Sequence, residues 1–385
     1  MKNKFLIVIG TRPELIKLAP VIIEFKKRFS NPPIIILNTA QHKELLKPYW
    51  EIFQIKPDYE LNFMKKGQSL SQLTARGLTQ LEKFINTIQL EKTNIIGILA
   101  QGDTTTVMVS SMIAFYKNIP FFHLEAGLRT FDLHNPFPEE FNRKVASISA
   151  QIHFAPTKIS KNNLKNEGID KNIIVSGNTI VDAVNLFKSK FKNYQIKNKQ
   201  LYELSFANHN HNVLITCHRR ENHGKNLLNI ISAVCKLANE FKQYNFIWPL
   251  HPNPNVGAVI KNQINPTRFQ NIYLTEPLDY LDLLFVLSKS NLVLTDSGGI
   301  QEEAPSFNVP VLVLRKKTER PEGIESGVAW LVGTNKSTIY NKASELLKNK
   351  KFNFKNPYGN GRAAKIVVDN LLNTIEELNE GYLSP

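Results

Sequence analysis

Apolar and polar positions along the chain follow two alternating patterns. Short runs rich in isoleucine, leucine and valine, such as residues 5–10 and 292–295, are separated by longer segments with apolar residues at helical spacing. The runs predict strands that are buried on both faces, and the longer segments predict amphipathic helices. Strands that alternate with helices assemble into parallel sheets covered on both sides. We therefore predict an α/β fold built from doubly wound, Rossmann-like parallel sheets.

The same pattern predicts the individual elements of both halves of the chain. In the first half, we expect strands at residues 5–10, 34–38, 95–100, 121–124, 152–155 and 173–175, and helices at 13–28, 42–53, 70–90, 104–116 and 138–150. In the second half, we expect strands at 213–216, 246–249, 272–274, 292–295, 311–314 and 329–332, and helices at 226–241, 280–288, 300–307, 336–348 and 361–379. Residues 188–212 are polar and are interpreted as a connection or a surface insertion at the start of the second domain.

The length of the chain favours two domains, because a single core seldom organises 385 residues. We place the first domain at residues 1–178 and the second at 179–362. Residues 363–385 are expected to form a C-terminal helix that packs back toward the first domain. Ligands of doubly wound sheets bind beyond the carboxyl ends of the strands. The active site is therefore expected in the cleft between the two domains.

Composition and charge narrow the class of ligand. The apolar runs are far shorter than the roughly 20 residues of a membrane helix, so no membrane association is expected. Two cysteines are too few for a disulfide framework; they favour a reducing cytoplasm, and Cys217 is interpreted as a packing residue. The formal charge of +15 is compatible with nucleic acid, but the lysines are scattered without interleaved stacking aromatics. We therefore expect no nucleic acid, and a basic field that attracts small anionic substrates.

The segment Asp296-Ser297-Gly298-Gly299 follows an apolar strand and opens a helix. Glycines let the backbone approach a ligand closely, and the free amides of a helix N-terminus attract anions. We predict that Ser297, Gly298 and Gly299 hold a diphosphate. Glu303, about one turn into the helix, is then placed to accept hydrogen bonds from ribose hydroxyls. The alternative is a capped helix that uses its glycines only for the turn.

Cationic side chains are expected near the same ligand. Arg12 follows the first strand, and arginine binds phosphate through two parallel hydrogen bonds. Lys17 lies one helical turn further on. Arg320 belongs to a predicted polar loop at residues 318–322 and is a second candidate for the nucleotide. The alternatives are a surface pair between Arg12 and Glu14, and a solvated run of charges around Arg320.

Carboxylates follow several strands of the first half. Asp103 follows one predicted strand after two intervening residues, Glu125 comes directly after another, and Glu139 stands at the start of a predicted helix with Arg143 one turn later. A carboxylate in a cleft can transfer protons as a general acid or base. Each acid also has a structural interpretation, since Asp103 could cap a helix and Glu125 could form an ion pair. Three acids that converge on one cleft favour the catalytic interpretation.

Two histidines follow consecutive strands of the second half. His218 and His251 are at strand ends, where an imidazole can bind a phosphate or transfer a proton near neutral pH. A histidine that only stabilises its loop is the alternative for each. No metal-ligand spacing connects them to cysteines, so no metal site is predicted.

Eight of these segments, in this order, resemble the non-hydrolysing UDP-N-acetylglucosamine 2-epimerases, whose fold is of the GT-B type. The segments are residues 10–14, 102–106, 125–130, 138–143, 218–221, 251–255, 296–304 and 318–322. The resemblance implies a cytoplasmic homodimer that interconverts UDP-N-acetylglucosamine and UDP-N-acetylmannosamine without a nicotinamide cofactor or metal ion. The product would serve surface polysaccharide synthesis, in capsule or lipopolysaccharide.

The resemblance also implies roles for individual residues. The implied catalytic set is Asp103, Glu125, Glu139 and His218, with Arg143 and Lys17 in support. The implied UDP contacts are Ser297, Gly298, Gly299 and Glu303, with Arg12 and Arg320 near the diphosphate and Leu283 against the uracil. His251 is a further predicted substrate-binding residue.

The implied mechanism is anti elimination of UDP across C1–C2 of the sugar, which gives 2-acetamidoglucal, followed by re-addition of UDP. One carboxylate removes the C2 proton and another acid returns a proton on the opposite face. Which of the three acids is the base stays open. A hydrolysing epimerase, a glycosyltransferase of the same fold, and a non-catalytic sensor of UDP-sugars are the rival hypotheses.

Overall fold

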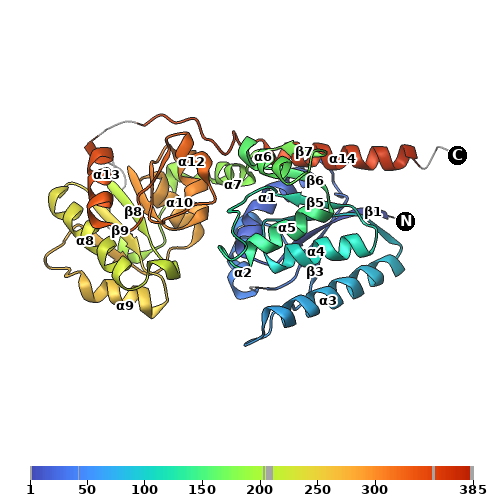
Figure 1. Ribbon diagram of the computed structural model, residues 1–385, viewed down its shortest axis with the longest axis horizontal. Helices are drawn as coiled ribbons and strands as arrows, with labels where there is room; N and C mark the ends of the chain where they lie inside the picture. The colour runs from blue at the N-terminus through green and yellow to red at the C-terminus, as the bar shows by residue number, and fades with distance from the viewer. Residues whose placement is uncertain (1, 42, 203, 205–210, 349–351, 382–385) are drawn as a thin grey trace. The chain divides into compact units, whose positions relative to one another are not determined.

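The computed structural model describes residues 2–41, 43–202, 204, 211–348 and 352–381. They form two compact units (Figure 1): Met1–Ala183 together with Tyr358–Pro385, and Val184–Pro357. The boundary between the units lies within helix α7, Thr179–Lys188.

The first unit is built on a seven-stranded parallel sheet. Its strand order is β3-β2-β1-β4-β5-β6-β7. The strands are β1 (Lys2–Ile9), β2 (Ile34–Asn38), β3 (Tyr59–Glu60), β4 (Thr93–Gln101), β5 (Phe121–Leu124), β6 (Ala150–Ala155) and β7 (Ile173–Val175). Because β1 pairs with β2 on one side and β4 on the other, the turns that follow β1 and β4 are neighbours.

Helices cover this sheet and bury its apolar side chains. They are α1 (Arg12–Arg28), α2 (Lys43–Phe53), α3 (Leu70–Leu90), α4 (Thr105–Tyr116), α5 (Glu139–Ser149), α6 (Lys158–Asn166) and the first residues of α7. Continuous apolar strands such as β1, whose residues Phe5 to Ile9 are buried, fit a sheet covered on both faces.

The C-terminal helix α14 (Ala363–Gly381) completes the first unit, and Figure 1 shows it in red beside elements from the start of the chain. It packs on α1, where Arg28 forms an ion pair with Asp369. The carboxylate of Asp182 accepts hydrogen bonds from the N–H groups of Ala363 and Ala364. A carboxylate at the first turn stabilises a helix, because the free amides there carry partial positive charge.

The second unit repeats this architecture with a six-stranded parallel sheet of order β10-β9-β8-β11-β12-β13. The strands are β8 (Asn212–Thr216), β9 (Asn245–Pro249), β10 (Ile272–Thr275), β11 (Leu292–Thr295), β12 (Val311–Val313) and β13 (Ala329–Leu331). The α-helices are the end of α7 with α8 (Lys225–Glu240), α9 (Pro254–Gln263), α10 (Tyr280–Ser288), α11 (Gly298–Glu303), α12 (Pro321–Glu325) and α13 (Lys336–Lys348).

The predicted sheets are confirmed, and the differences fall on short or polar elements. Strand β3 has two residues, and helix α6 buries only Ser160 and Leu164, so neither carries a clear apolar pattern. Helices α7 and α9 were also not predicted, and the expected polar loop at 318–322 was wrong because α12 begins there at Pro321. The predicted connection contains two short 3-10 helices, Ser189–Asn193 and Lys199–Leu201.

Candidate functional site

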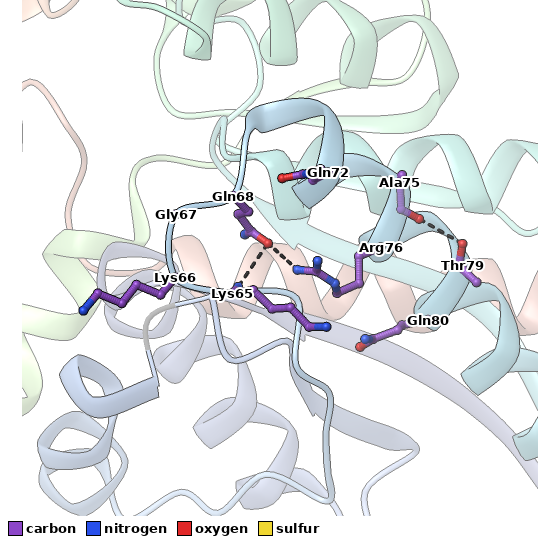
Figure 2. Close-up of a pocket in the computed structure, with 9 residues that line it drawn as sticks. All are labelled: Lys65, Lys66, Gly67, Gln68, Gln72, Ala75, Arg76, Thr79 and Gln80. Carbon is purple, nitrogen blue, oxygen red and sulfur yellow. Dashed lines mark hydrogen bonds between the residues drawn. The ribbon is translucent and has the colours of Figure 1, made fainter.

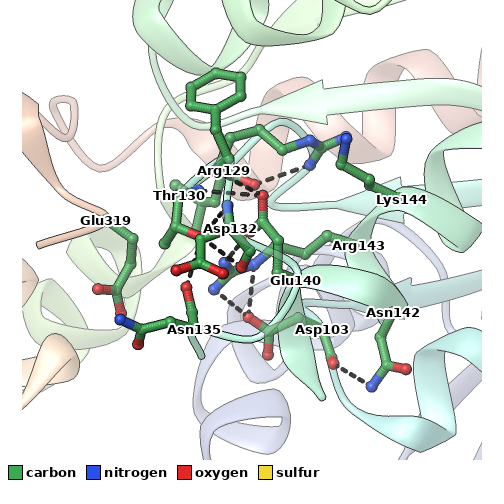
Figure 3. A network of polar contacts seen from close by, with 12 residues as sticks. Asp103, Arg129, Thr130, Asp132, Asn135, Glu140, Asn142, Arg143, Lys144 and Glu319 are labelled. Atoms are coloured by element: carbon green, nitrogen blue, oxygen red, sulfur yellow. Dashed lines mark hydrogen bonds and ion pairs between the residues drawn. The ribbon is translucent and has the colours of Figure 1, made fainter. Parts of the chain in front are cut away.

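Asp103 lies in the turn between β4 and α4 and forms an ion pair with Arg143 of α5 (Figure 3). Its Oδ2 accepts hydrogen bonds from Nη2 of Arg143 at 2.6 Å and from Nε at 2.9 Å. The same guanidinium donates from Nη1 to Glu140 at 2.8 Å. The alternative in which Asp103 caps α4 is wrong, because Thr104 is the N-cap and accepts from the N–H of Val107. Arg143 therefore fixes the Asp103 carboxylate from one side.

Asp103 and Glu139 line a common pocket of about 330 Å³ in the first unit. Glu139 is the first residue of α5, and Asn142 of the same helix donates a hydrogen bond to the backbone carbonyl of Asp103 at 2.9 Å. The other residues that line the pocket are Thr11, Gln41, Met64, Gln68, Ser69, Leu70, Leu73, Thr104, Thr105 and Pro138. Two acids on one small cavity can act on the same bound molecule.

Glu125, the third predicted acid, is held differently. It has a φ of +69°, a left-handed conformation that is uncommon for a residue other than glycine. Its carboxylate pairs with Lys17 and accepts hydrogen bonds from the side-chain amides of Gln101 and Asn178. The side chains of Lys17 and Glu125 are both buried, and Glu125 is not among the residues that line the pocket of Asp103.

Glu14 connects the turns that follow β1 and β4. Its carboxyl group accepts hydrogen bonds from the N–H groups of Gly10 and Thr11 and from the hydroxyl of Thr104. Burial raises the pKa of Glu14 to about 7, although these hydrogen bonds oppose the shift. Glu14 is thus turned inward to the backbone, whereas Arg12 is exposed with its guanidinium carbon 5.8 Å from the ring centroid of Tyr49.

His123 supports the Asp103 turn and was not singled out in the sequence. It is fully buried in β5, and its Nε2 lies 2.7 Å from the carbonyl oxygen of Gly102. Burial lowers the pKa of His123 to about 4, so the ring is neutral near pH 7 and donates from Nε2. The available signal was a polar residue inside an otherwise apolar strand.

In the second unit, Ser297 is the N-cap of α11, and its side chain makes no capping hydrogen bond. Gly298 lies close against Arg320, because an added Cβ would lie 2.7 Å from Nη1 of Arg320 and 2.8 Å from Cζ, so the guanidinium would have to shift. An added Cβ at Gly299 would meet only Oγ of Ser297, at 3.9 Å. The start of α11 therefore brings a hydroxyl, backbone amides and a guanidinium together. Glu303 lies further along this helix and is buried.

Arg320 belongs to a buried network of charges. Its Nε donates to Glu302 at 2.7 Å, and its Nη1 lies 2.6 Å from Glu319. Glu319 also pairs with Arg315 at 2.8 Å. Burial would raise the pKa of Glu319, but Arg320, Arg315 and Arg219 together hold it well below its usual range. The interpretation of this segment as a solvated run of charges is therefore wrong for Arg315 and Arg320.

His218 and His251 lie side by side. Their ring centroids are 5.5 Å apart and the planes differ by 17°, which is a stacked arrangement. Nδ1 of His218 lies 3.1 Å from Oδ1 of Asp296, the residue that follows β11. Cys217 is buried, and burial is the main cause that raises the pKa of its thiol well above the usual value. This agrees with the interpretation of Cys217 as a packing residue rather than a nucleophile.

Leu283 is half-buried on α10, and the part of its side chain that stays accessible can contact a ligand.

A second pocket, of about 660 Å³, lies at the start of α3 (Figure 2). Its basic side chains are Lys65, Lys66 and Arg76, and Oε1 of Gln68 accepts hydrogen bonds from the N–H of Lys65 and from Arg76. Gln68 also lines the pocket of Asp103 and Glu139.

No group of three or more histidine, cysteine or carboxylate side chains suited to a metal ion occurs among the described residues. Across the part of the chain that the structure describes, no helix combines the length and apolar character needed to cross a bilayer.

Two doubly wound parallel sheets with polar residues after their strands place the chain in the class of GT-B-type α/β proteins. A profile of the UDP-N-acetylglucosamine 2-epimerase family matches residues 27–372. The UDP-N-acetylglucosamine 2-epimerase of Neisseria meningitidis is 44% identical over 376 residues, 96% of this chain and 99% of the relative. That of Bacillus subtilis is 40% identical over 378 residues, 96% of this chain and 95% of the relative. The chain belongs to the UDP-N-acetylglucosamine 2-epimerase family.

Solved structures agree with this assignment. The crystal structure of the Neisseria meningitidis enzyme bound to UDP-GlcNAc has a TM-score of 0.86 and 43% identity, and the match covers 96% of this chain and 100% of that chain. The Methanocaldococcus jannaschii enzyme in complex with UDP-GlcNAc and UDP has a TM-score of 0.77 and 36% identity, with coverage of 96% and 99%. The predicted GT-B fold is confirmed.

Proposed function

We propose that the protein is a non-hydrolysing epimerase that interconverts UDP-N-acetylglucosamine and UDP-N-acetylmannosamine at C2 of the sugar. The observation that carries the proposal is the pocket that Asp103 and Glu139 share in the first unit. Family membership supports the choice of substrate, since relatives bear the name of this activity and one solved relative is bound to UDP-GlcNAc. Inversion at C2 needs an acid and a base on opposite faces, which two separately held carboxylates can provide.

The proposed reaction is an anti elimination followed by re-addition. A carboxylate takes the C2 proton while the C1–O bond to UDP breaks, which gives UDP and 2-acetamidoglucal. UDP then adds back at C1 while a proton returns to C2 on the other face. Direct removal of the weakly acidic C2 proton would leave its charge on carbon, whereas elimination transfers that charge to the diphosphate.

The first unit would contain the groups that act on the sugar. Asp103, held by Arg143, and Glu139 are placed to exchange protons with a molecule in their pocket. Glu125 completes the proposed catalytic set, and Lys17, its partner in a buried ion pair, supports it. Because Lys17 pairs with the Glu125 carboxylate, a proton on Glu125 would cost the energy of that pair.

The second unit would bind UDP. The proposed contacts of the diphosphate are the amides of Gly298 and Gly299, the hydroxyl of Ser297 and the guanidinium of Arg320, which meet at the start of α11. Arg12 of the first unit would also bind a phosphate. Glu303 would accept from the ribose, and Leu283 would contact the uracil. His218 and His251 would face the departing diphosphate, where cationic groups stabilise the charge that develops.

The proposal also covers the oligomeric state of the protein, its cellular location and the use of its product. We propose a homodimer, supported by exposed Phe115 and Tyr116 at the end of α4 and exposed Ile148 on the adjoining helix α5. Light scattering at several protein concentrations tests this assembly. The free thiols of Cys217 and Cys235 agree with a cytoplasmic location, and surface polysaccharide synthesis is the proposed use of the product.

Proton NMR of the enzyme with UDP-GlcNAc as sole substrate, in D₂O, tests the reaction. The proposal expects a mixture of UDP-GlcNAc and UDP-ManNAc, with deuterium incorporated at C2 of both. Free N-acetylmannosamine with an equal amount of UDP would instead identify a hydrolysing enzyme. Tight binding of UDP-GlcNAc with no turnover would identify a sensor.

A further inference from the structure

The carboxylate of Asp296 joins two turns of the second unit. Asp296 follows β11 and is fully buried, and the segment that contains His218 follows the neighbouring strand β8. Oδ2 of Asp296 accepts hydrogen bonds from the backbone N–H groups of His218 and Arg219 and from Nδ2 of Asn222, each at 2.9 Å. Three donors on one oxygen fix the orientation of the carboxylate, because hydrogen bonds to an ionised acceptor are strong and directional.

The second oxygen of this carboxylate faces the imidazole of His218. Oδ1 is buried and forms no hydrogen bond within the described residues, and it lies 3.1 Å from Nδ1 of the ring, while 40% of the His218 side chain is exposed. The nitrogen that faces Asp296 is thus Nδ1, which leaves Nε2 on the opposite side of the ring. An ionised carboxylate only accepts hydrogen bonds, so it favours the form of the ring in which Nδ1 carries a proton.

The neighbouring imidazole, that of His251, faces a hydrogen-bond donor at Nδ1 instead of an acceptor. Nδ1 of His251 accepts a hydrogen bond from the N–H of Asn253 at 3.2 Å, so a neutral His251 carries its proton on Nε2. His251 stacks on His218. The two stacked imidazoles therefore face different groups through Nδ1, a carboxylate for His218 and a backbone N–H for His251, and His251 serves as an internal comparison for His218.

The thiol of Cys217 also contacts Asp296. Burial and the charge of Asp296 raise the pKa of this thiol well above its usual value, so it remains protonated and neutral. A thiol is a weak hydrogen-bond donor, and it does not replace the imidazole as partner of an ionised carboxylate.

We propose that Asp296 is a positioning residue that keeps the His218 proton on Nδ1 and presents Nε2 to the ligand. A neutral His218 then accepts a proton at Nε2, and a protonated His218 donates from Nε2 to an anionic oxygen. The ring keeps one orientation in both states, because its Nδ1 edge stays against the Asp296 carboxylate. The role of His218 at the departing diphosphate rests on the proposed function, whereas the position of its proton does not.

The first test reads the tautomers directly by NMR of the full-length protein labelled with ¹⁵N-histidine. Loss of signals in His218→Gln and His251→Gln assigns the two rings. At a pH where both rings are neutral, we expect a protonated Nδ1 in His218 and a protonated Nε2 in His251. Wild-type protein in which His218 carries its proton on Nε2 overturns the proposal, even if no Asp296 variant folds.

Asp296→Asn is the matched substitution. Its amide oxygen can keep the three N–H donors, which turns its NH₂ group toward Nδ1 of His218 and moves the ring proton to Nε2. We expect the His218 tautomer to reverse and that of His251 to stay unchanged. An unchanged His218 in a folded Asp296→Asn protein also overturns the proposal.

Kinetics provides the second test. If the protein is the epimerase proposed above, Asp296→Asn lowers kcat by about 100-fold or more and changes KM by less than about threefold, since the wrong tautomer impairs chemistry more than binding. The same substitution added to His218→Gln has little further effect, because both act through one ring. Losses that multiply would show that Asp296 acts independently of His218. A wild-type protein without epimerase activity refutes the proposed function and leaves the tautomer result standing.

Discussion

The polar pairs that follow the strands are arranged in opposite ways in the two units. In the first unit the acid is the more accessible partner, since 27% of the Asp103 side chain is exposed but only 5% of Arg143. In two pairs of the second unit, His218–Asp296 and Arg320–Glu302, the basic side chain is the more accessible partner, whereas Arg315 is buried beside the more exposed Glu221. The exposed fraction is 40% for His218 against 0% for Asp296, and 11% for Arg320 against 1% for Glu302. A buried cation thus anchors Asp103 in the first unit, and buried acids anchor His218 and Arg320 in the second.

This difference fits the division of work that we propose. Proton transfer at C2 needs a carboxylate that reaches the sugar, whereas departure of UDP needs cations that reach the diphosphate. The Lys17–Glu125 pair follows neither arrangement, because both side chains are buried to a similar extent, with 7% and 8% exposed. Substitutions that remove the accessible partner or the anchor can therefore separate catalysis, nucleotide binding and stability.

The largest expected effect is on catalysis in the first unit. We expect Glu139→Gln to lower kcat by about 10³-fold, because a neutral amide cannot transfer the proton, and to change the Kd for UDP by less than about threefold. Turnover by NMR and UDP binding by calorimetry measure the two quantities. Asp170→Asn, which removes an exposed carboxylate of the same unit, is the matched control. Full turnover in Glu139→Gln would remove Glu139 from the catalytic set.

The next effect is on the stability of the second unit. Glu319→Gln leaves Arg315 and Arg320 without their shared counter-charge, so we expect the free energy of unfolding at pH 7 to fall by about 3–5 kcal/mol. The wild-type pKa of Glu319 is held below its usual 4.5, so its stabilisation is present above pH 4.5 and is lost as the pH falls. Urea unfolding at pH 7 and pH 4 should show a smaller difference at pH 4.

The exposed Glu325 of the same segment provides the control for that experiment. Glu325→Gln should change the free energy of unfolding by less than about 0.5 kcal/mol at either pH. An equal loss of stability in both variants would show that Glu319 is not needed as the counter-charge of Arg315 and Arg320.

Glu14 of the first unit should show the opposite dependence on pH. Its folded pKa of about 7 lies above the ordinary value of 4.5. The contribution of Glu14 to the free energy of unfolding is therefore highest below pH 4.5, where the carboxyl group is protonated in the folded and unfolded states. This contribution is lost as the pH rises to about 7. The glutamine of Glu14→Gln resembles the protonated acid at every pH. The free energy of unfolding of the variant minus that of the wild type should therefore be roughly 2–3 kcal/mol higher at pH 8 than at pH 4.5. Urea unfolding across this range measures the change, and parallel curves would contradict the raised pKa.

The smallest expected effect is a difference in stability between substitutions of two adjacent glycines, measured without ligand. We expect Gly298→Ala to lower the free energy of unfolding by about 1–3 kcal/mol, because the new Cβ would lie 2.7 Å from Arg320. Gly299→Ala meets only a contact at 3.9 Å, so its stability should be unchanged or slightly higher. Thermal unfolding of the two variants tests the difference. Equal stability would mean that Arg320 moves aside without cost.

Local patterns of apolar and polar residues were enough to predict the two parallel sheets and the residues at the strand ends. Each strand is a local run of apolar residues, and each turn is the polar segment that follows, so both can be predicted without long-range contacts. The segments at 102–106, 138–143 and 296–304 were predicted in this way. The elements that could not be predicted, such as β3 and α6, bury too few apolar residues to show a local pattern.

The identity of the charged partners, in contrast, is visible only in the folded chain. Arg143 binds a carboxylate 40 residues earlier in the chain, and the backbone N–H of His218 binds a carboxylate 78 residues later. These partners meet because β8 lies beside β11 and α5 packs on α4, and such neighbours depend on the order in which strands and helices assemble. Local patterns of apolar and polar residues do not predict that order. The contacts by which Asp296 and Glu14 connect neighbouring turns were therefore visible only in the folded chain.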